Sequence, residues 1–94
     1  EGGIIMAVSV MLSVDLNNVT SEARTKFYEE LKTRLWVKLK LTTTWRAQFT
    51  EGATHAAAIS TTKSDVEAAA KLAGITNYEA AASASDERPT EWKS

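Results

Sequence analysis

MAVSVMLSVD, residues 6–15, is the stretch that decides the fold, because its large apolar side chains recur at every second position. Such alternation is typical of a β-strand that turns one face toward a hydrophobic core. Met11 interrupts the small residues of the other face, which indicates a partly covered, central strand. We expect the strand to end at Asp15. The large residues are Met6, Val8, Val10, Leu12 and Val14, and the small ones are Ala7, Ser9 and Ser13.

A helix is predicted to follow this strand. Thr20 is a candidate N-cap, and Glu22 lies in the first turn, where the helix dipole favours a negative charge. An apolar stripe recurs every four residues and charged side chains fill the other face, so one side of the helix should pack on a sheet. The stripe consists of Ala23, Phe27, Leu31 and Leu35, widened by Tyr28.

The longest alternation in the chain covers residues 37–49. We expect one strand of about thirteen residues, with a bend or bulge near residues 42–44 because strands usually have five or six residues. Glu51-Gly52 then supplies a turn. The mostly apolar set is Val37, Leu39, Leu41, Thr43, Trp45, Ala47 and Phe49, and the polar set is Lys38, Lys40, Thr42, Thr44, Arg46 and Gln48.

Two further elements complete the chain. A weaker alternation of small residues over 54–61 predicts a third strand. Residues 62–65, Thr-Lys-Ser-Asp, resemble a capping box, so we expect a second helix to begin there and to stop at Gly74. Alternating Tyr and Ala residues over 78–84 predict a last strand, which Pro89 ends or confines to a sheet edge.

The resulting order is β-α-β-β-α-β. With right-handed crossovers it gives the ferredoxin-like α+β sandwich, whose four-stranded antiparallel sheet has the order 4-1-3-2 and carries both helices on one face. We expect a single domain over residues 1–94, with a core of about residues 6–85 and a polar tail over 86–94. A chain this short buries only roughly 60 to 65% of its unfolded surface, so a homodimer is expected.

Composition narrows the classes of function. The formal net charge of -1 argues against nucleic-acid binding by bulk charge, and the absence of cysteine excludes disulfides and thiolate metal sites. The apolar run over residues 4–12 is about half the length of a membrane-spanning helix, and no basic region precedes it as in a signal peptide. We therefore expect no membrane association and a cytoplasmic location. No phosphate-binding loop, dinucleotide fingerprint or nucleophile elbow is present.

Asp15 is the candidate catalytic and metal-binding residue, because it lies where a core strand runs into a turn. One such carboxylate from each of two subunits would suit Mg²⁺, which takes one or two carboxylates and keeps several waters. The alternative is a solvated turn residue that bonds the backbone at Asn17 or Asn18.

Lys38, Lys40 and Arg46 are predicted to share one face of the long strand, and such a basic stripe can follow a phosphate backbone. An edge strand also carries lysine simply to prevent aggregation. The only histidine, His55, has no neighbouring serine or acid in the sequence to orient it, so we expect it to be structural or exposed. Trp45 has core parity and the third strand lacks aromatic residues, which argues against an RNA-recognition motif.

Three segments of the chain carry a resemblance to a known family: Ser13-Val14-Asp15-Leu16, Tyr28-Glu29-Glu30-Leu31-Lys32 and Leu41-Thr42-Thr43-Thr44-Trp45. They resemble the small CRISPR-associated ferredoxin-fold nucleases and their relatives, which include virulence-associated protein D and the antitoxin ribonuclease GhoS. The resemblance spans about residues 8–72. It implies a dimer whose sheets face each other and metal-dependent cleavage of RNA or DNA near Asp15. Several relatives are structural or nucleic-acid-holding subunits instead, and this chain lacks the arginine-rich segments that typically follow the first strand in CRISPR members.

Two hypotheses of different classes remain. The first is a homodimeric, nucleic-acid-associated protein, namely a magnesium-dependent endoribonuclease with Asp15 as metal ligand and Lys38, Lys40 and Arg46 as phosphate contacts. The second is a non-catalytic dimeric sandwich that binds a small ligand or a protein partner on its open sheet face. Small residues would leave room there: Ala56, Ala58, Ala80, Ala82 and Ala84.

Overall fold

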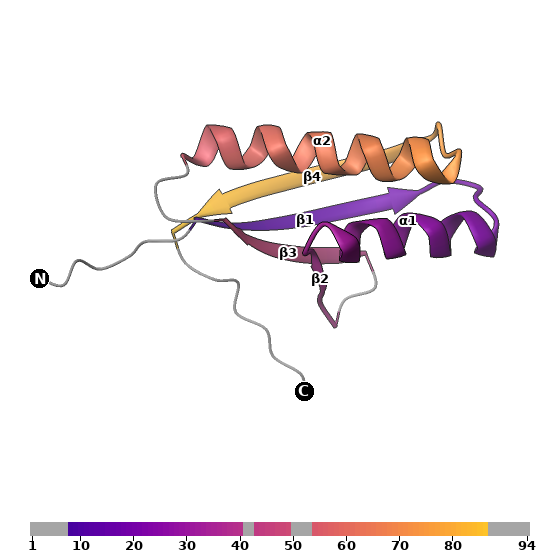
Figure 1. Ribbon diagram of the computed structural model, residues 1–94, viewed down its shortest axis with the longest axis horizontal. Coiled ribbons are helices and arrows are strands. Elements are labelled where there is room, and N and C mark those ends of the chain that lie inside the picture. Colours follow the sequence, from indigo (N-terminus) through magenta and orange to yellow (C-terminus); the bar gives the residue numbers. More distant parts are fainter. Residues whose placement is uncertain (1–7, 41–42, 50–53, 87–94) are drawn as a thin grey trace, which may run out of the picture.

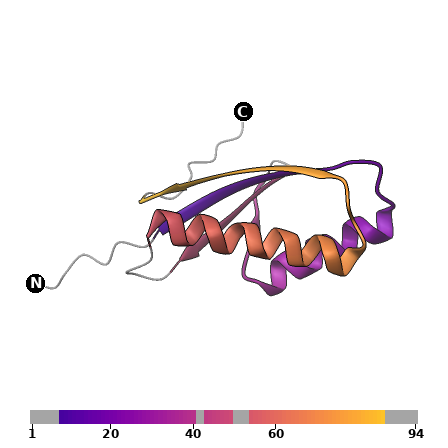
Figure 2. The same cartoon turned by 90° about the horizontal axis from the view of Figure 1, so that it is seen from above.

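The computed structural model describes residues 8–40, 43–49 and 54–86. Its elements are β1 (Val8–Leu16), α1 (Ser21–Thr33), β2 (Val37–Lys38), β3 (Thr44–Phe49), α2 (His55–Ala73) and β4 (Tyr78–Ser85). Within these ranges the strands form one antiparallel sheet of order β2-β3-β1-β4, and both helices lie on one of its faces (Figures 1 and 2). The predicted ferredoxin-like α+β fold and its 4-1-3-2 strand order are thus confirmed.

β1 is a central strand, as its sequence predicts. It pairs with β3 on one side and with β4 on the other. Its even-numbered side chains face the helices and are at most 4% exposed: Val8, Val10, Leu12 and Val14. Phe27 and Leu31 of α1 and Val66 of α2 close the same core. Met11 lies on the opposite face and is 42% exposed, so the middle of that face is uncovered.

Residues 37–49 do not form the single strand that their alternation predicts. They fold into a hairpin, in which β2 pairs antiparallel with β3 so that Val37 lies opposite Arg46 and Lys38 opposite Trp45. The N–H of Leu39 donates to the carbonyl of Thr44 at 2.8 Å and continues the pairing toward the turn. The alternation of apolar and polar residues continues through the point where the chain reverses, and the sequence there contains no glycine, proline or asparagine that would indicate a turn.

The predicted third strand, residues 54–61, is the beginning of α2 instead. The hydroxyl of Thr54 accepts a hydrogen bond from the backbone N–H of Ala57 at 3.0 Å, so the helix is capped there. Thr62, the predicted cap, is buried within the helix and donates its hydroxyl to the carbonyl of Ala58 at 2.8 Å. Alternation among small residues was misleading, because alanine is also the best helix former.

Both helices end in a Schellman motif. At the end of α2 the N–H of Ile75 donates to the carbonyl of Ala70 at 2.8 Å. Gly74, at φ 72°, supplies the left-handed residue and confirms the predicted helix stop. At the end of α1 the N–H of Trp36 donates to the carbonyl of Leu31 at 3.0 Å.

Leu35 takes the left-handed position in the α1 motif, with φ 71°. A leucine there costs roughly 1–2 kcal/mol, because its Cβ crowds the following carbonyl oxygen. The stripe of apolar residues predicts Leu35 in the core, but α1 has already ended at Thr33 and Leu35 is 81% exposed. Trp36 enters the core in its place and is 2% exposed.

Asp65 of α2 is a buried carboxylate that ties the two helices together. It accepts hydrogen bonds from the indole N–H of Trp36 at 2.9 Å and from Arg34 at 3.2 Å. Arg34 also donates to Glu30 at 2.8 Å. The carboxylates of Glu30 and Asp65 raise the pKa of the Arg34 guanidinium. Each polar group of this bridge therefore has a partner, as a buried carboxylate requires.

Several predictions fall outside the described residues. They are the turn at Glu51-Gly52 and the part of the polar tail from residue 87 onward, including Pro89. Within the described parts of the chain, neither helix combines the length and the apolar character that a bilayer crossing needs.

Leu35→Gly should stabilise the protein by about 1 kcal/mol, because glycine adopts a positive φ without steric cost and the leucine side chain is largely in solvent. Gly74→Ala should destabilise it by about the same amount, since a Cβ at Gly74 would meet no atom within 4 Å and only the backbone cost remains. Urea unfolding followed by circular dichroism measures both. A loss of stability in Leu35→Gly would contradict the motif at the end of α1.

Asp65→Ala should destabilise the protein by roughly 1–3 kcal/mol, because the buried N–H of Trp36 loses its acceptor. Ser64→Ala, at an exposed position one residue earlier on α2, is the matched control and should change stability by less than about 0.5 kcal/mol. Equal unfolding midpoints in urea for the two variants would contradict the bridge.

Candidate functional site

The side of the sheet opposite the helices is here called the open face. Directly paired residues in an antiparallel sheet project to the same side, so the register defines this face. Asp15 and Arg46 both belong to it. Its residues are Val37 of β2, Thr44, Arg46 and Gln48 of β3, Ser9, Met11, Ser13 and Asp15 of β1, and Glu79, Ala81, Ser83 and Ser85 of β4.

Asp15 does not stand alone on the open face. Glu79 of β4 lies directly opposite it, so two exposed carboxylates are neighbours on adjacent strands. Together with Ser13 and Thr43 they line a shallow hollow of about 460 Å³. Like charges directly opposite each other destabilise a sheet, and a bound cation would remove that repulsion.

The backbone beside this pair is fixed. The N–H of Asn17 donates to the carbonyl of Asn77 at 3.2 Å, and the Asn17 side-chain amide donates to the Asn77 side-chain oxygen at 3.2 Å. Among the described residues, no hydrogen bond joins the Asp15 carboxylate to Asn17 or Asn18. No contact therefore supports the alternative interpretation, in which Asp15 bonds the backbone of the turn.

Glu79 is not among the predicted site residues, because the pattern of the last strand is dominated by its alternating Tyr and Ala residues. Its odd position beside Tyr78 and Ala80 does place it on the second face of that strand. Its pairing with Asp15, however, depends on the register between β1 and β4. Sequence parity specifies a face and leaves the register open.

The predicted basic stripe is divided by the hairpin. Lys38 lies opposite Trp45, which is fully buried beneath the helices, whereas Arg46 lies opposite Val37 on the open face. The prediction that Lys38 and Arg46 share one face is therefore wrong. Lys40 is exposed in the connection that follows β2.

Of the three predicted basic residues, Arg46 is the one that the register of the described strands places on the same face as Asp15. Its partner on β1 is Met11, four residues before Asp15, which corresponds to about 14 Å along the strands at roughly 3.4 Å per residue.

His55 is exposed, which is one of the two outcomes expected for it. It is the first residue of α2, and its Nε2 lies 2.9 Å from Oδ1 of Asp86. The fold therefore places an acidic residue beside His55, although no acid neighbours His55 in the sequence. This pair follows the Ser9–Ser85 end of the sheet, six residues and roughly 20 Å from Asp15.

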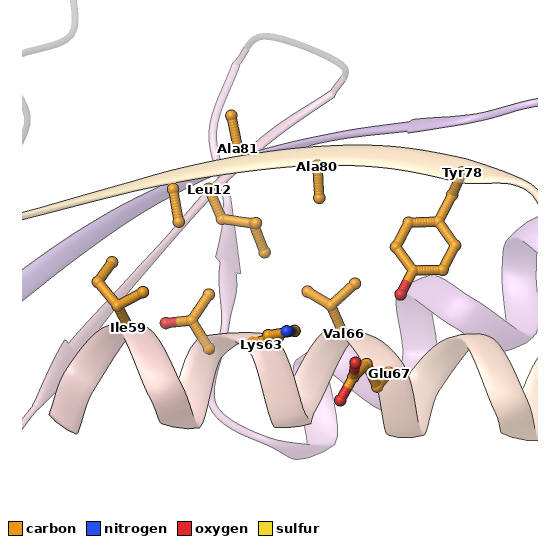
Figure 3. A pocket seen from close by; sticks show the side chains of 10 residues that line it. Leu12, Ile59, Lys63, Val66, Glu67, Tyr78, Ala80 and Ala81 are labelled. Atoms are coloured by element: carbon orange, nitrogen blue, oxygen red, sulfur yellow. The ribbon is translucent and has the colours of Figure 1, made fainter. Parts of the chain in front are cut away.

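The small residues predicted to line the open face lie elsewhere. Ala56 and Ala58 belong to α2, and the alanines at even positions of β4 face the helices. Two of them, Ala80 and Ala82, border a groove of about 250 Å³ between α2 and β4 (Figure 3). Ala80 also borders the hollow beside Asp15, together with Ala81, among mainly polar residues.

The donor set around Asp15 fits one kind of metal ion. Across the ranges that the structure describes, no three or more His, Cys, Asp or Glu side chains gather in a cluster. Two carboxylates suit Mg²⁺, which fills its remaining positions with water or phosphate oxygens, better than Zn²⁺, which requires three or four protein ligands.

Comparison of the chain with protein-family models, with curated proteins and with solved structures gives no match. The assignment of a function therefore rests on the geometry of the open face and of the groove beside β4.

Proposed function

We propose that this protein is a magnesium-dependent endoribonuclease whose site lies on the open face of the sheet. The observation that carries the proposal is the direct pairing of Asp15 with Glu79 in a shallow hollow. These two carboxylates would hold the ion. When bound, Mg²⁺ supplies charge stabilisation to a phosphoryl oxygen and a more acidic water.

The side chains around the pair support this chemistry. Ser13 lies two residues before Asp15 on the same face, and its hydroxyl lies 3.5 Å from that of Thr44, so polar groups border the hollow. Arg46 would bind a phosphate of the same strand of RNA, about 14 Å from the carboxylates. Because Glu79 supplies the second carboxylate, one chain suffices to hold the ion.

The resemblance of residues 8–72 to ferredoxin-fold nucleases also supports the proposal, since it implies an acid at the end of the first strand and Asp15 is the second-last residue of β1. The same resemblance supports a homodimer with RNA or DNA as the partner, and we propose a cytoplasmic location with them. These remain parts of the proposal.

A second candidate function is the non-catalytic binding of a small ligand or a protein. The groove between α2 and β4 favours it, because Leu12, Ile59 and Val66 give that groove an apolar lining. A binding protein of this kind would need neither Asp15 nor a metal ion.

Cleavage of single-stranded RNA, measured with and without Mg²⁺, tests the first function. Wild-type protein should cleave only with Mg²⁺, and Asp15→Asn and Glu79→Gln should each lower the rate at least tenfold, because each removes a ligand. Glu22→Gln, which changes an exposed carboxylate on α1, is the matched control and should retain full activity. Equal rates in all four proteins, or cleavage by none, would contradict the metal site.

Binding of a single-stranded oligonucleotide as a function of salt tests the phosphate contact. Arg46→Gln should weaken binding and reduce the slope of log affinity against log salt by about 0.7, the value for one phosphate contact on a single strand. Lys38→Gln should leave the slope unchanged, because Lys38 lies on the other face. The same loss of slope in both variants would argue against binding on the open face.

A further inference from the structure

The free edge of β4 and the groove beside it form a second surface, which shares Glu79 with the proposed metal site. In the described part of the sheet β4 is a terminal strand, with β1 on one side of it and no strand on the other. α2 runs along β4 in both overall views (Figures 1 and 2). The groove between them is partly open to solvent.

The register tells which backbone groups β4 offers at this edge. In an antiparallel ladder alternate residues bond to opposite neighbours. Asn17 donates to Asn77, one position beyond the Leu16–Tyr78 pair, so odd-numbered residues of β4 bond to β1. The even-numbered residues therefore direct their N–H and carbonyl groups outward: Tyr78, Ala80, Ala82 and Ala84.

The groove indicates which side chains of an added strand would fit beside those backbone hydrogen bonds. Figure 3 shows Leu12, Val66 and the ring of Tyr78 directed into the space between strand and helix, with Ile59 at one end. A strand added to β4 would direct every second side chain into this apolar space.

The charges around the edge are mainly negative. Glu67 of α2 borders the groove together with Lys63, and Glu79 lies on the open face of β4 itself. A basic side chain next to Glu79 would therefore be favoured, and an acidic one disfavoured.

A lone extended segment is the simplest occupant of this edge, because it carries no helix of its own. Antiparallel pairing of two β4 strands about a two-fold axis would bring a second α2 onto the same face of the sheet, where the two helices would have to pack against each other.

We propose that β4 and α2 form a docking site for an extended peptide segment of a partner protein. The segment adds to the sheet as a fifth strand, places apolar side chains in the groove at alternate positions, and places a lysine or arginine beside Glu79. The site requires neither metal nor nucleic acid, so it stands whether or not the chain cleaves RNA.

The test uses fluorescein-labelled ten-residue peptides in EDTA, measured by fluorescence anisotropy. The first alternates valine with threonine and carries one central lysine in place of a threonine. The second carries glutamate at that position, and the third is the lysine peptide with alternate backbone nitrogens methylated. The lysine peptide should bind at least fivefold more tightly than the glutamate peptide, and methylation on the bonding side should abolish binding.

Ala82→Pro removes one outward N–H of β4 and leaves the bonds to β1 intact, so it should weaken the lysine peptide at least fivefold. Unchanged far-ultraviolet circular dichroism checks its fold. Ser64→Ala, on the exposed side of α2 away from the groove lining, is the control and should bind normally.

No binding of the lysine peptide to the wild-type chain overturns the proposal. So does binding that survives backbone methylation, or that Ala82→Pro leaves unchanged in a folded protein. Sedimentation showing a wild-type dimer that Ala82→Pro converts to a monomer would assign the edge to a second copy and would also overturn it.

Discussion

The two-sided hydrogen bonding of β1 is the constraint on which the rest of this structure depends. Its even residues bond to β3 and its odd residues to β4, and the same alternation sends valine and leucine side chains under the helices. Because β1 pairs with both neighbouring strands, its register also determines which side chains meet on the open face. Asp15 meets Glu79, and Arg46 meets Met11, as a result of that single register.

The fold was predictable where a pattern had one physical meaning. Large apolar residues at alternate positions, as in β1, share one face only in a strand, and that face is buried. Gly74 is well suited to ending a helix. The pattern failed where alanine and threonine dominate. Alternating small residues fit a strand, but alanine favours a helix, and residues 55–61 belong to α2.

Two errors compensated for each other in the order of elements. The strand lost from residues 54–61 was replaced by the hairpin in residues 37–49, so the order β-α-β-β-α-β still held. The predicted positions of the site residues were not corrected by this exchange of elements. A hairpin reverses the direction of the chain, and it moved Lys38 away from the face that carries Arg46. Glu79 could be assigned to a face by parity, but its neighbour across the strands follows from the register.

The position of β1 in the chain has a consequence for the order in which the protein assembles. β1 is the first described element and its partner β4 is the last, so the Ser9–Ser85 contact joins residues far apart in sequence. A chain still being synthesised has β1, both helices and the hairpin before β4 emerges. Until then the odd-numbered backbone groups of β1 are unpaired, and the nascent chain exposes a second, purely transient edge at the centre of its future sheet.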